Sequence, residues 1–87
     1  MRNIRTIEEA LNLFEKNSII YGNTFISGNY KVCNKAYDII MKCGDFLKEE
    51  EKMDLLLPFL EHEKVSIKYV SACFFYYHYI QKKVKRL

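Results

Sequence analysis

Histidine, glutamate and cysteine are the residues of this chain that could do chemistry, and His62-Glu63 comes nearest to a motif. A zinc-protease motif needs a second histidine one helical turn after the first, and that position holds Ser66. The other histidine, His78, lies sixteen residues beyond His62. The spacing therefore predicts no metal site. We expect His62 instead to bond free backbone groups at a helix end.

The cysteines and the remaining polar residues give no stronger sign of catalysis. Cys33, Cys43 and Cys73 are odd in number and never form a CxxC pair. Without an export signal at the start of the chain, this pattern predicts free, buried thiols and a cytoplasmic protein. No glycine-rich phosphate loop, paired carboxylates or positioned nucleophile can be found. We therefore expect no enzyme activity, no cofactor and no small-molecule substrate.

Composition indicates what kind of fold carries these residues. The chain has 87 residues, of which 49% are apolar, and it contains three glycines and one proline. So few turn-forming residues favour a few long helices over many short strands. No apolar run reaches the roughly 18 residues of a membrane span. We expect one all-α domain over residues 1–87, built as a compact four-helix unit of two antiparallel hairpins.

Helix-end signals divide the first hairpin, expected over about residues 7–47. Thr6 and Glu9 form a capping box, Gly28 suits a helix C-terminus, and Asn29 suits the next N-terminus. Gly22 interrupts the first helix and could permit close approach of a neighbouring helix. Helical spacing predicts two buried stripes: Ile7, Leu11, Phe14 and Tyr21 in the first helix, and Cys33, Ala36, Tyr37, Ile40 and Leu47 in the second.

The second hairpin is expected over about residues 52–83. The acidic run 49–51 suits the positive end of a helix dipole, so it is predicted to open the third helix. Pro58 should kink that helix because it removes a backbone bond. The fourth helix should run from about 64 to 83, with Tyr69, Phe74, Tyr76 and Tyr77 in the core.

A narrow polar arc distinguishes the fourth helix. At 100° per residue it contains Lys64, Lys68, Ser71, His78 and Lys82, and Phe75 falls in its middle. An aromatic ringed by polar and basic groups has the composition of an interface anchor. The sequence therefore predicts a partner-binding face that looks outward and consists of Lys68, Phe75, His78 and Lys82, with Tyr79 at its edge.

Residues 56–72 resemble a HEAT-type repeat, with Leu56-Leu57-Pro58-Phe59-Leu60 followed by a corner and then Ser66-Ile67-Lys68. The whole chain is similar to a small bacterial helical family catalogued as domain of unknown function 2019. The residues that carry this likeness are Gly28-Asn29-Tyr30, Asn34, Tyr37, Leu57-Pro58, Leu60, His62 and Ala72. The resemblance implies a short HEAT-like bundle without a described enzyme activity. Small helical families of this kind include immunity proteins beside bacterial toxins, which suggests such a role by analogy.

Charge distribution bears on the partner. Residues 1–63 hold eight basic and eleven acidic side chains, a net of −3, whereas residues 64–87 hold six basic and none acidic, a net of +6. We expect a non-catalytic module that binds an acidic patch on another protein, with Lys68 and Lys82 steering the encounter. Two alternatives stay open: nucleic-acid binding through the basic C-terminal segment, and a self-associating unit such as a homodimer.

Overall fold

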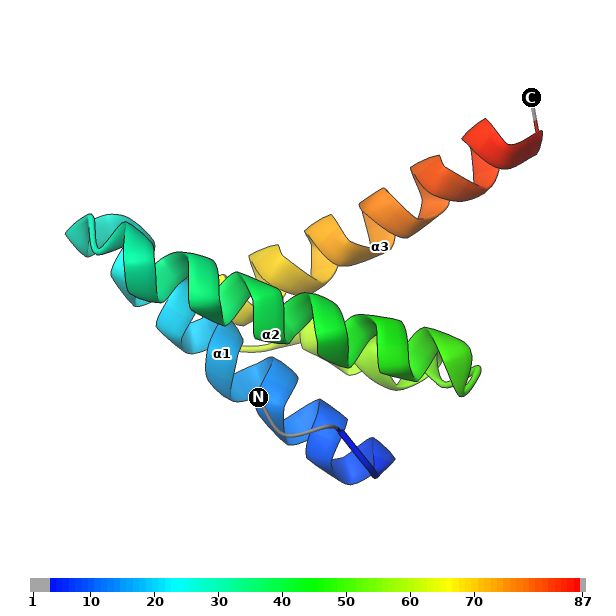
Figure 1. Cartoon of the computed structure of the whole chain (residues 1–87), viewed down its shortest axis with the longest axis horizontal. Coiled ribbons are helices and arrows are strands. Elements are labelled where there is room, and N and C mark those ends of the chain that lie inside the picture. The colour runs from blue at the N-terminus through cyan, green and yellow to red at the C-terminus, as the bar shows by residue number, and fades with distance from the viewer. Residues whose placement is uncertain (1–3, 87) are drawn as a thin grey trace.

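Residues 4–86 form three α-helices and one 3-10 helix in the computed structural model, which describes the side chains of residues 4–78 and 80. The elements are α1 (Ile7–Ser27), α2 (Tyr30–Glu49), η1 (Met53–Glu61) and α3 (Val65–Arg86). No strand occurs in this part of the chain, so the all-α prediction is confirmed. Figure 1 shows α1 and α2 packed as an antiparallel pair, while α3 diverges from them and its C-terminal half projects from the body.

The ends of α1 and α2 follow from local capping, as predicted. The Thr6 hydroxyl accepts a hydrogen bond from the Glu9 amide at 3.1 Å, which satisfies a free donor at the start of α1. Gly28 ends α1 with a φ of 82°, a left-handed conformation that glycine adopts without strain. The Asn29 side chain then accepts from the Val32 amide at 3.4 Å and begins α2.

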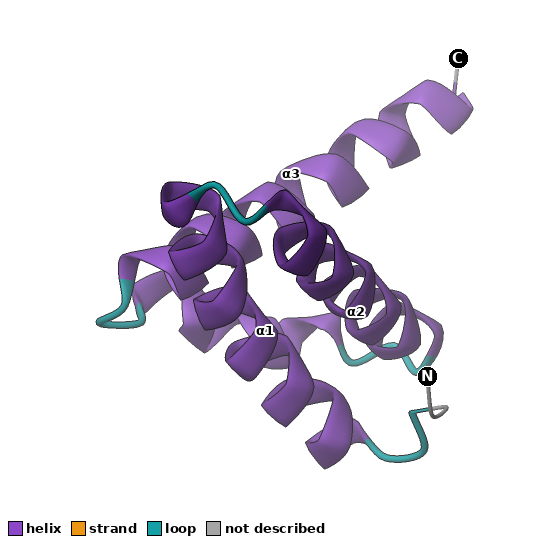
Figure 2. Cartoon of the chain, turned by 60° about the vertical axis from the view of Figure 1, so that its left-hand side comes forward, coloured by secondary structure: helices purple, strands orange, loops and turns teal. Residues whose placement is uncertain are grey.

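The chain between α2 and η1 differs from the prediction. Glu49 is the last residue of α2, and Glu51 has a φ of 58°, so the acidic run closes α2 instead of opening the next helix. The Lys52 amide donates to the Leu47 carbonyl at 2.8 Å, which completes this reversal. The third helix is a 3-10 helix that contains Pro58, not a kinked α-helix. As Figure 2 shows, short loops join the four elements.

Phe14 of α1 lies at the centre of the core and is fully buried. Its ring stacks on Phe59 of η1 at 5.8 Å between centroids and meets Phe74 of α3 edge-on at 6.2 Å. One side chain thus holds α1, η1 and α3 together. The buried members of the core cluster are Ala10, Phe14, Ile40, Cys43, Leu47, Leu56, Val70 and Phe74.

Two glycines let α3 approach the α1–α2 pair closely. A Cβ placed on Gly22 would lie 2.5 Å from the Cβ of Ser66, so only glycine fits where α3 begins. A Cβ on Gly44 would overlap the ring of Phe74, two turns farther along α3. The close approach predicted at Gly22 is confirmed, and the two contacts fix the angle at which α3 leaves the body.

None of the helices within residues 4–86 combines the length and the apolar character needed to cross a membrane.

Candidate functional site

The middle of the polar arc of α3 packs against the body of the protein, contrary to the prediction, whereas Lys64 and Lys68 at its start are exposed. Ser71 is fully buried, and its hydroxyl donates to the Ile67 carbonyl at 2.8 Å. Phe75 is half-buried and packs against the core cluster. A serine that bonds to its own helix backbone can face a core, because its hydroxyl then needs no other partner. The arc therefore provides no continuous outward face.

The tyrosines of α3 show the complementary error. Tyr69, Tyr76 and Tyr77 were expected in the core, yet they are 61%, 69% and 51% exposed, and only Phe74 of the predicted aromatic set is buried. Tyrosine combines an apolar ring with a hydroxyl that favours water, so it tolerates a position at the surface. The side of α3 that carries Tyr69, Tyr76 and Tyr77, which the sequence placed in the core, is therefore largely exposed to solvent.

The five predicted partner-binding residues do not gather on one outward face. Lys68 is exposed, Phe75 lies against the core, and His78 is partly buried beside a hollow of about 220 Å³ that Asp45 and Lys48 of α2 also line. The side chains of Tyr79 and Lys82 lie outside the described residues. The side chains of the basic segment 82–86, on which nucleic-acid binding depends, are not described either, so that alternative stays a prediction.

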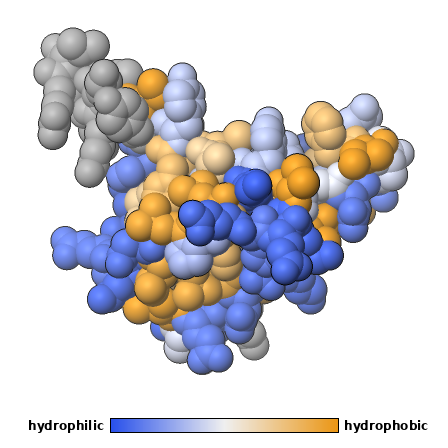
Figure 3. Space-filling view, turned by 180° about the vertical axis from the view of Figure 1, so that it is seen from behind, coloured by the Kyte–Doolittle hydropathy of each residue, from blue (hydrophilic) through white to orange (hydrophobic). Residues whose placement is uncertain are grey.

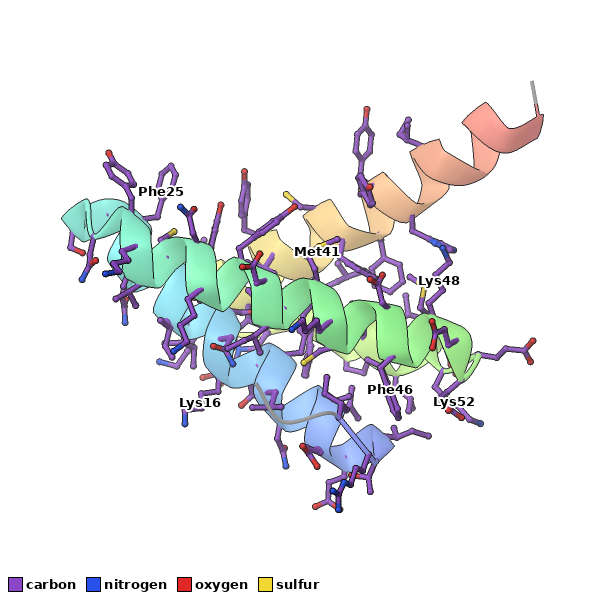
Figure 4. The ribbon with its side chains drawn as sticks, in the orientation of Figure 1. Lys16, Phe25, Met41, Phe46, Lys48 and Lys52 are labelled. Carbon is purple, nitrogen blue, oxygen red and sulfur yellow. The ribbon has the colours of Figure 1, made fainter. Side chains whose placement is uncertain are left out.

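A groove of about 290 Å³ opens between α2 and α3 and is the candidate site. Figure 4 shows Met41 in the angle between these two helices, while Lys16 lies on a different side of the protein. Tyr21 of α1 also lines the groove, and the centroid of its ring lies 6.3 Å from that of Tyr37 on α2. We call this the tyrosine groove, and its lining is Tyr21, Tyr37, Ile40, Met41, Tyr69, Val70, Cys73, Phe74 and Tyr77.

An exposed apolar surface continues from the tyrosine groove to the end of the molecule where α1 turns into α2. Tyr21 stacks on Phe25 with ring centroids 6.0 Å apart, and Phe25, Ile26 and Tyr30 are all exposed. Seen from behind, hydrophobic surface reaches the outside in patches between hydrophilic residues (Figure 3). Phe25 thus extends the aromatic surface beyond the groove, whereas Tyr30 lies at the α1–α2 turn, outside the groove lining.

The lining of the groove carries no acidic or basic side chain. Burial raises the pKa of Tyr21, and a hydrogen bond between the side chains of Tyr69 and Cys73 raises the pKa of Tyr69. Both phenols therefore stay neutral at physiological pH. The groove offers ring faces and hydroxyl groups, which suits an uncharged, apolar surface that has a few hydrogen-bonding groups.

His62 closes the corner between η1 and α3, as the sequence predicted. Its Nδ1 accepts a hydrogen bond from the Lys64 amide at 3.0 Å, and its Nε2 lies 3.9 Å from a carboxylate oxygen of Glu15. Within the part of the chain that the structure describes, no three histidine, cysteine or carboxylate side chains gather as metal ligands would. The structure thus gives His62 a local structural role.

The three cysteines are free, but they differ in exposure. Cys33 and Cys43 are buried as expected, whereas Cys73 is exposed on the rim of the groove. The Cys33 thiol donates to the Tyr21 carbonyl with 3.8 Å between sulfur and oxygen. Burial raises the pKa of Cys43 from 9.0 to about 11, so its thiol is both shielded and protonated at neutral pH.

We expect a thiol reagent at pH 8 to label Cys73 rapidly and the two buried cysteines only after urea unfolding. Mass spectrometry of digested protein, with and without urea, measures this directly. Labelling of Cys43 at the rate of Cys73 in the folded protein would contradict this arrangement.

The raised pKa of Cys43 also makes the stability of the fold depend on pH. Because the fold favours the neutral Cys43 thiol, the contribution of this group to the free energy of unfolding is complete below pH 9.0 and is lost as the pH rises to about 11.

Sequence reasoning missed the groove because its lining comes from three helices. Tyr21 and Tyr37 were recognised, but as members of buried stripes. The one signal available was the excess of apolar residues around α3, which indicated that the helix needs cover on more than one side.

No family model matches the chain, and no curated protein or solved structure matches it either. The likeness to domain of unknown function 2019 stays a prediction.

Proposed function

We propose that the protein is a non-catalytic binding module that holds an apolar segment of another protein in the tyrosine groove. The observation that supports this is the gathering of four tyrosines, Tyr21, Tyr37, Tyr69 and Tyr77, around one open, uncharged groove. Tyrosine is enriched among the residues that contribute most to binding energy at protein interfaces. An immunity-type role would be one instance of this function, and it rests on the sequence resemblance alone.

The position of α3 supports the same function. Gly22 and Gly44 fix where α3 meets the α1–α2 pair, and the core ring contacts of Phe74 hold it there. The groove walls are therefore set by packing inside the protein before a partner arrives. A preformed groove loses little conformational entropy on binding, which favours affinity.

Photo-crosslinking in the native cell tests this function. A photoreactive phenylalanine analogue replaces Tyr37 of α2 in the groove. The matched control places the same analogue at exposed Lys16 of α1, on a different side of the protein. We expect a specific protein to crosslink at position 37 and not at position 16. The absence of a crosslink at position 37, or equal crosslinking at both positions, would reject the groove as the binding site.

The partner identified by crosslinking is then purified, and its affinity for this protein is measured before and after Cys73 of this protein has been alkylated with a bulky maleimide. Since Cys73 lines the groove, the adduct should weaken binding at least tenfold. Cys73→Ser treated with the same reagent is the control and should bind as the untreated protein does. Unchanged binding by the alkylated wild type would also reject this function.

A further inference from the structure

Helix α3 has two apolar faces on opposite sides. One face, with Ile67, Val70 and Phe74, is buried against α1, α2 and η1. The other face is open: Val65, Tyr69 and Tyr76 are 75%, 61% and 69% exposed. We call it the open stripe, and its exposed members are Val65, Tyr69, Ala72, Tyr76 and Ile80. A helix that is apolar on both sides is covered on both sides in a stable assembly.

The spacing of the open stripe is that of a helix–helix seam. Its members follow one another at intervals of three or four residues, so they form one ridge along α3 about 22 Å long. Such a ridge fits the groove between the side chains of another helix. Tyr37 and Met41 of α2 stand beside it across the tyrosine groove, and they provide a second wall. The shape of the site therefore suits a helix more than an extended chain.

Charge along one edge of the stripe narrows the choice of occupant. Lys64 and Lys68 are exposed and, at 100° per residue, both fall on the edge of the stripe that lies away from the groove. No acidic residue occurs from position 64 to the end of the sequence. A second copy that docked through the same stripe would bring no carboxylate from its α3, so it would leave Lys64 and Lys68 without an acidic partner. A helix with carboxylates facing Lys64 and Lys68 has the complementary charge.

We propose that α3 docks an amphipathic α-helix of another protein along the open stripe, with acidic residues of that helix facing Lys64 and Lys68. The inference rests on the proposed function, because the docked helix is the segment that enters the tyrosine groove. It adds the conformation and the charge of that segment.

Three designed peptides of 20 residues test the proposal. All share a leucine stripe at helical spacing; one has glutamates along one edge, one has lysines there, and one has the glutamates but two central prolines. The protein contains no tryptophan, so one tryptophan in each peptide reports binding by its fluorescence alone. We expect the acidic helix to bind about tenfold more tightly than the basic helix at low salt, because Lys64 and Lys68 attract the glutamates of the one and repel the lysines of the other. The proline peptide should bind at least tenfold more weakly than the acidic helix.

Matched tyrosine variants then locate the peptide. Tyr76 on the open stripe and Tyr30 at the α1–α2 turn are almost equally exposed, at 69% and 67%. Tyr76→Ala should weaken binding of the acidic peptide about tenfold, and Tyr30→Ala should leave it unchanged within twofold. Equal effects of the two variants would overturn the location on α3.

Other outcomes separate this inference from the proposed function. Equal binding of acidic and basic peptides, full binding of the proline peptide, or failure of the acidic peptide to bind would overturn the helix proposal. So would concentration-dependent dimerisation that Tyr76→Asp abolishes, because the stripe would then be covered by a second copy. If the partner crosslinks at position 37 through an extended segment, the proposed function stands and the helix inference fails.

Discussion

Replacing Phe14 with alanine is expected to destabilise the folded protein by about 4 kcal/mol, more than any other single truncation considered. The Phe14 ring is fully buried and contacts both Phe59 and Phe74, so its removal leaves a cavity between three helices. Truncating a buried phenylalanine costs roughly 3–5 kcal/mol through lost burial and the cavity that remains. A domain of this size has a total stability of roughly 4–13 kcal/mol, so the variant should be largely unfolded when warmed.

Urea unfolding followed by circular dichroism at 222 nm measures this loss. Phe14→Leu is the matched control, because it keeps most of the apolar volume, and it should cost less than about 2 kcal/mol. A second control, Phe25→Ala, removes an exposed ring of the same type and should change stability by less than about 1 kcal/mol. If Phe14→Ala proved no more harmful than Phe25→Ala, the centre of the core would lie elsewhere.

The first hairpin could be predicted from the sequence because its signals are local. Thr6, Gly28 and Asn29 each act within four residues of their own position, through a cap hydrogen bond or a left-handed backbone conformation. Such signals do not depend on what the rest of the chain does. The bounds of α1 and the start of α2 were therefore predicted correctly before any tertiary contact was known.

The turn after α2 was predicted wrongly because acidic residues suit a helix start without requiring one. The run 49–51 was assigned to the third helix by its charge, but the chain must reverse there for η1 to reach Phe14. Glu51 makes that reversal in a left-handed conformation, which its sequence neighbours do not signal. A requirement of the tertiary fold outweighed a local dipole preference that contributes about 1 kcal/mol at most at an exposed site.

The phase of α3 could not be fixed from its sequence because apolar residues surround most of the helix. Tyrosine and phenylalanine were both treated as apolar aromatic residues, so the exposed Tyr76 and the buried Phe74 were assigned alike to the core. Ser71 and Phe75 then appeared to mark an outward seam. Ser71 can face the core because its hydroxyl bonds to the backbone of its own helix. Whether it does so depends on which helices pack beside α3. The tyrosine groove exists only as a consequence of this packing.

Replacing Gly44 with alanine is the second change with a large expected effect, and the sign of the effect is the test. In an isolated helix, alanine in place of glycine stabilises by about 1 kcal/mol. Here the added Cβ would overlap the ring of Phe74, which is itself buried and held edge-on against Phe14. The ring cannot retreat without moving α3, and overpacking of this kind costs roughly 1–3 kcal/mol. We expect a net loss of about 2 kcal/mol in urea unfolding.

A double-mutant cycle with Phe74→Leu shows whether the ring is the cause. Leucine lacks the ring atoms that meet position 44, so Gly44→Ala should be neutral or slightly stabilising in the Phe74→Leu background. A gain in stability from Gly44→Ala alone would mean that α3 does not rest on α2 at this point. Because Phe74 also lines the tyrosine groove, any folded Gly44→Ala protein should bind the acidic helical peptide more weakly than wild type does. The packing that fixes α3 and the surface that α3 presents to a partner would then be parts of one arrangement.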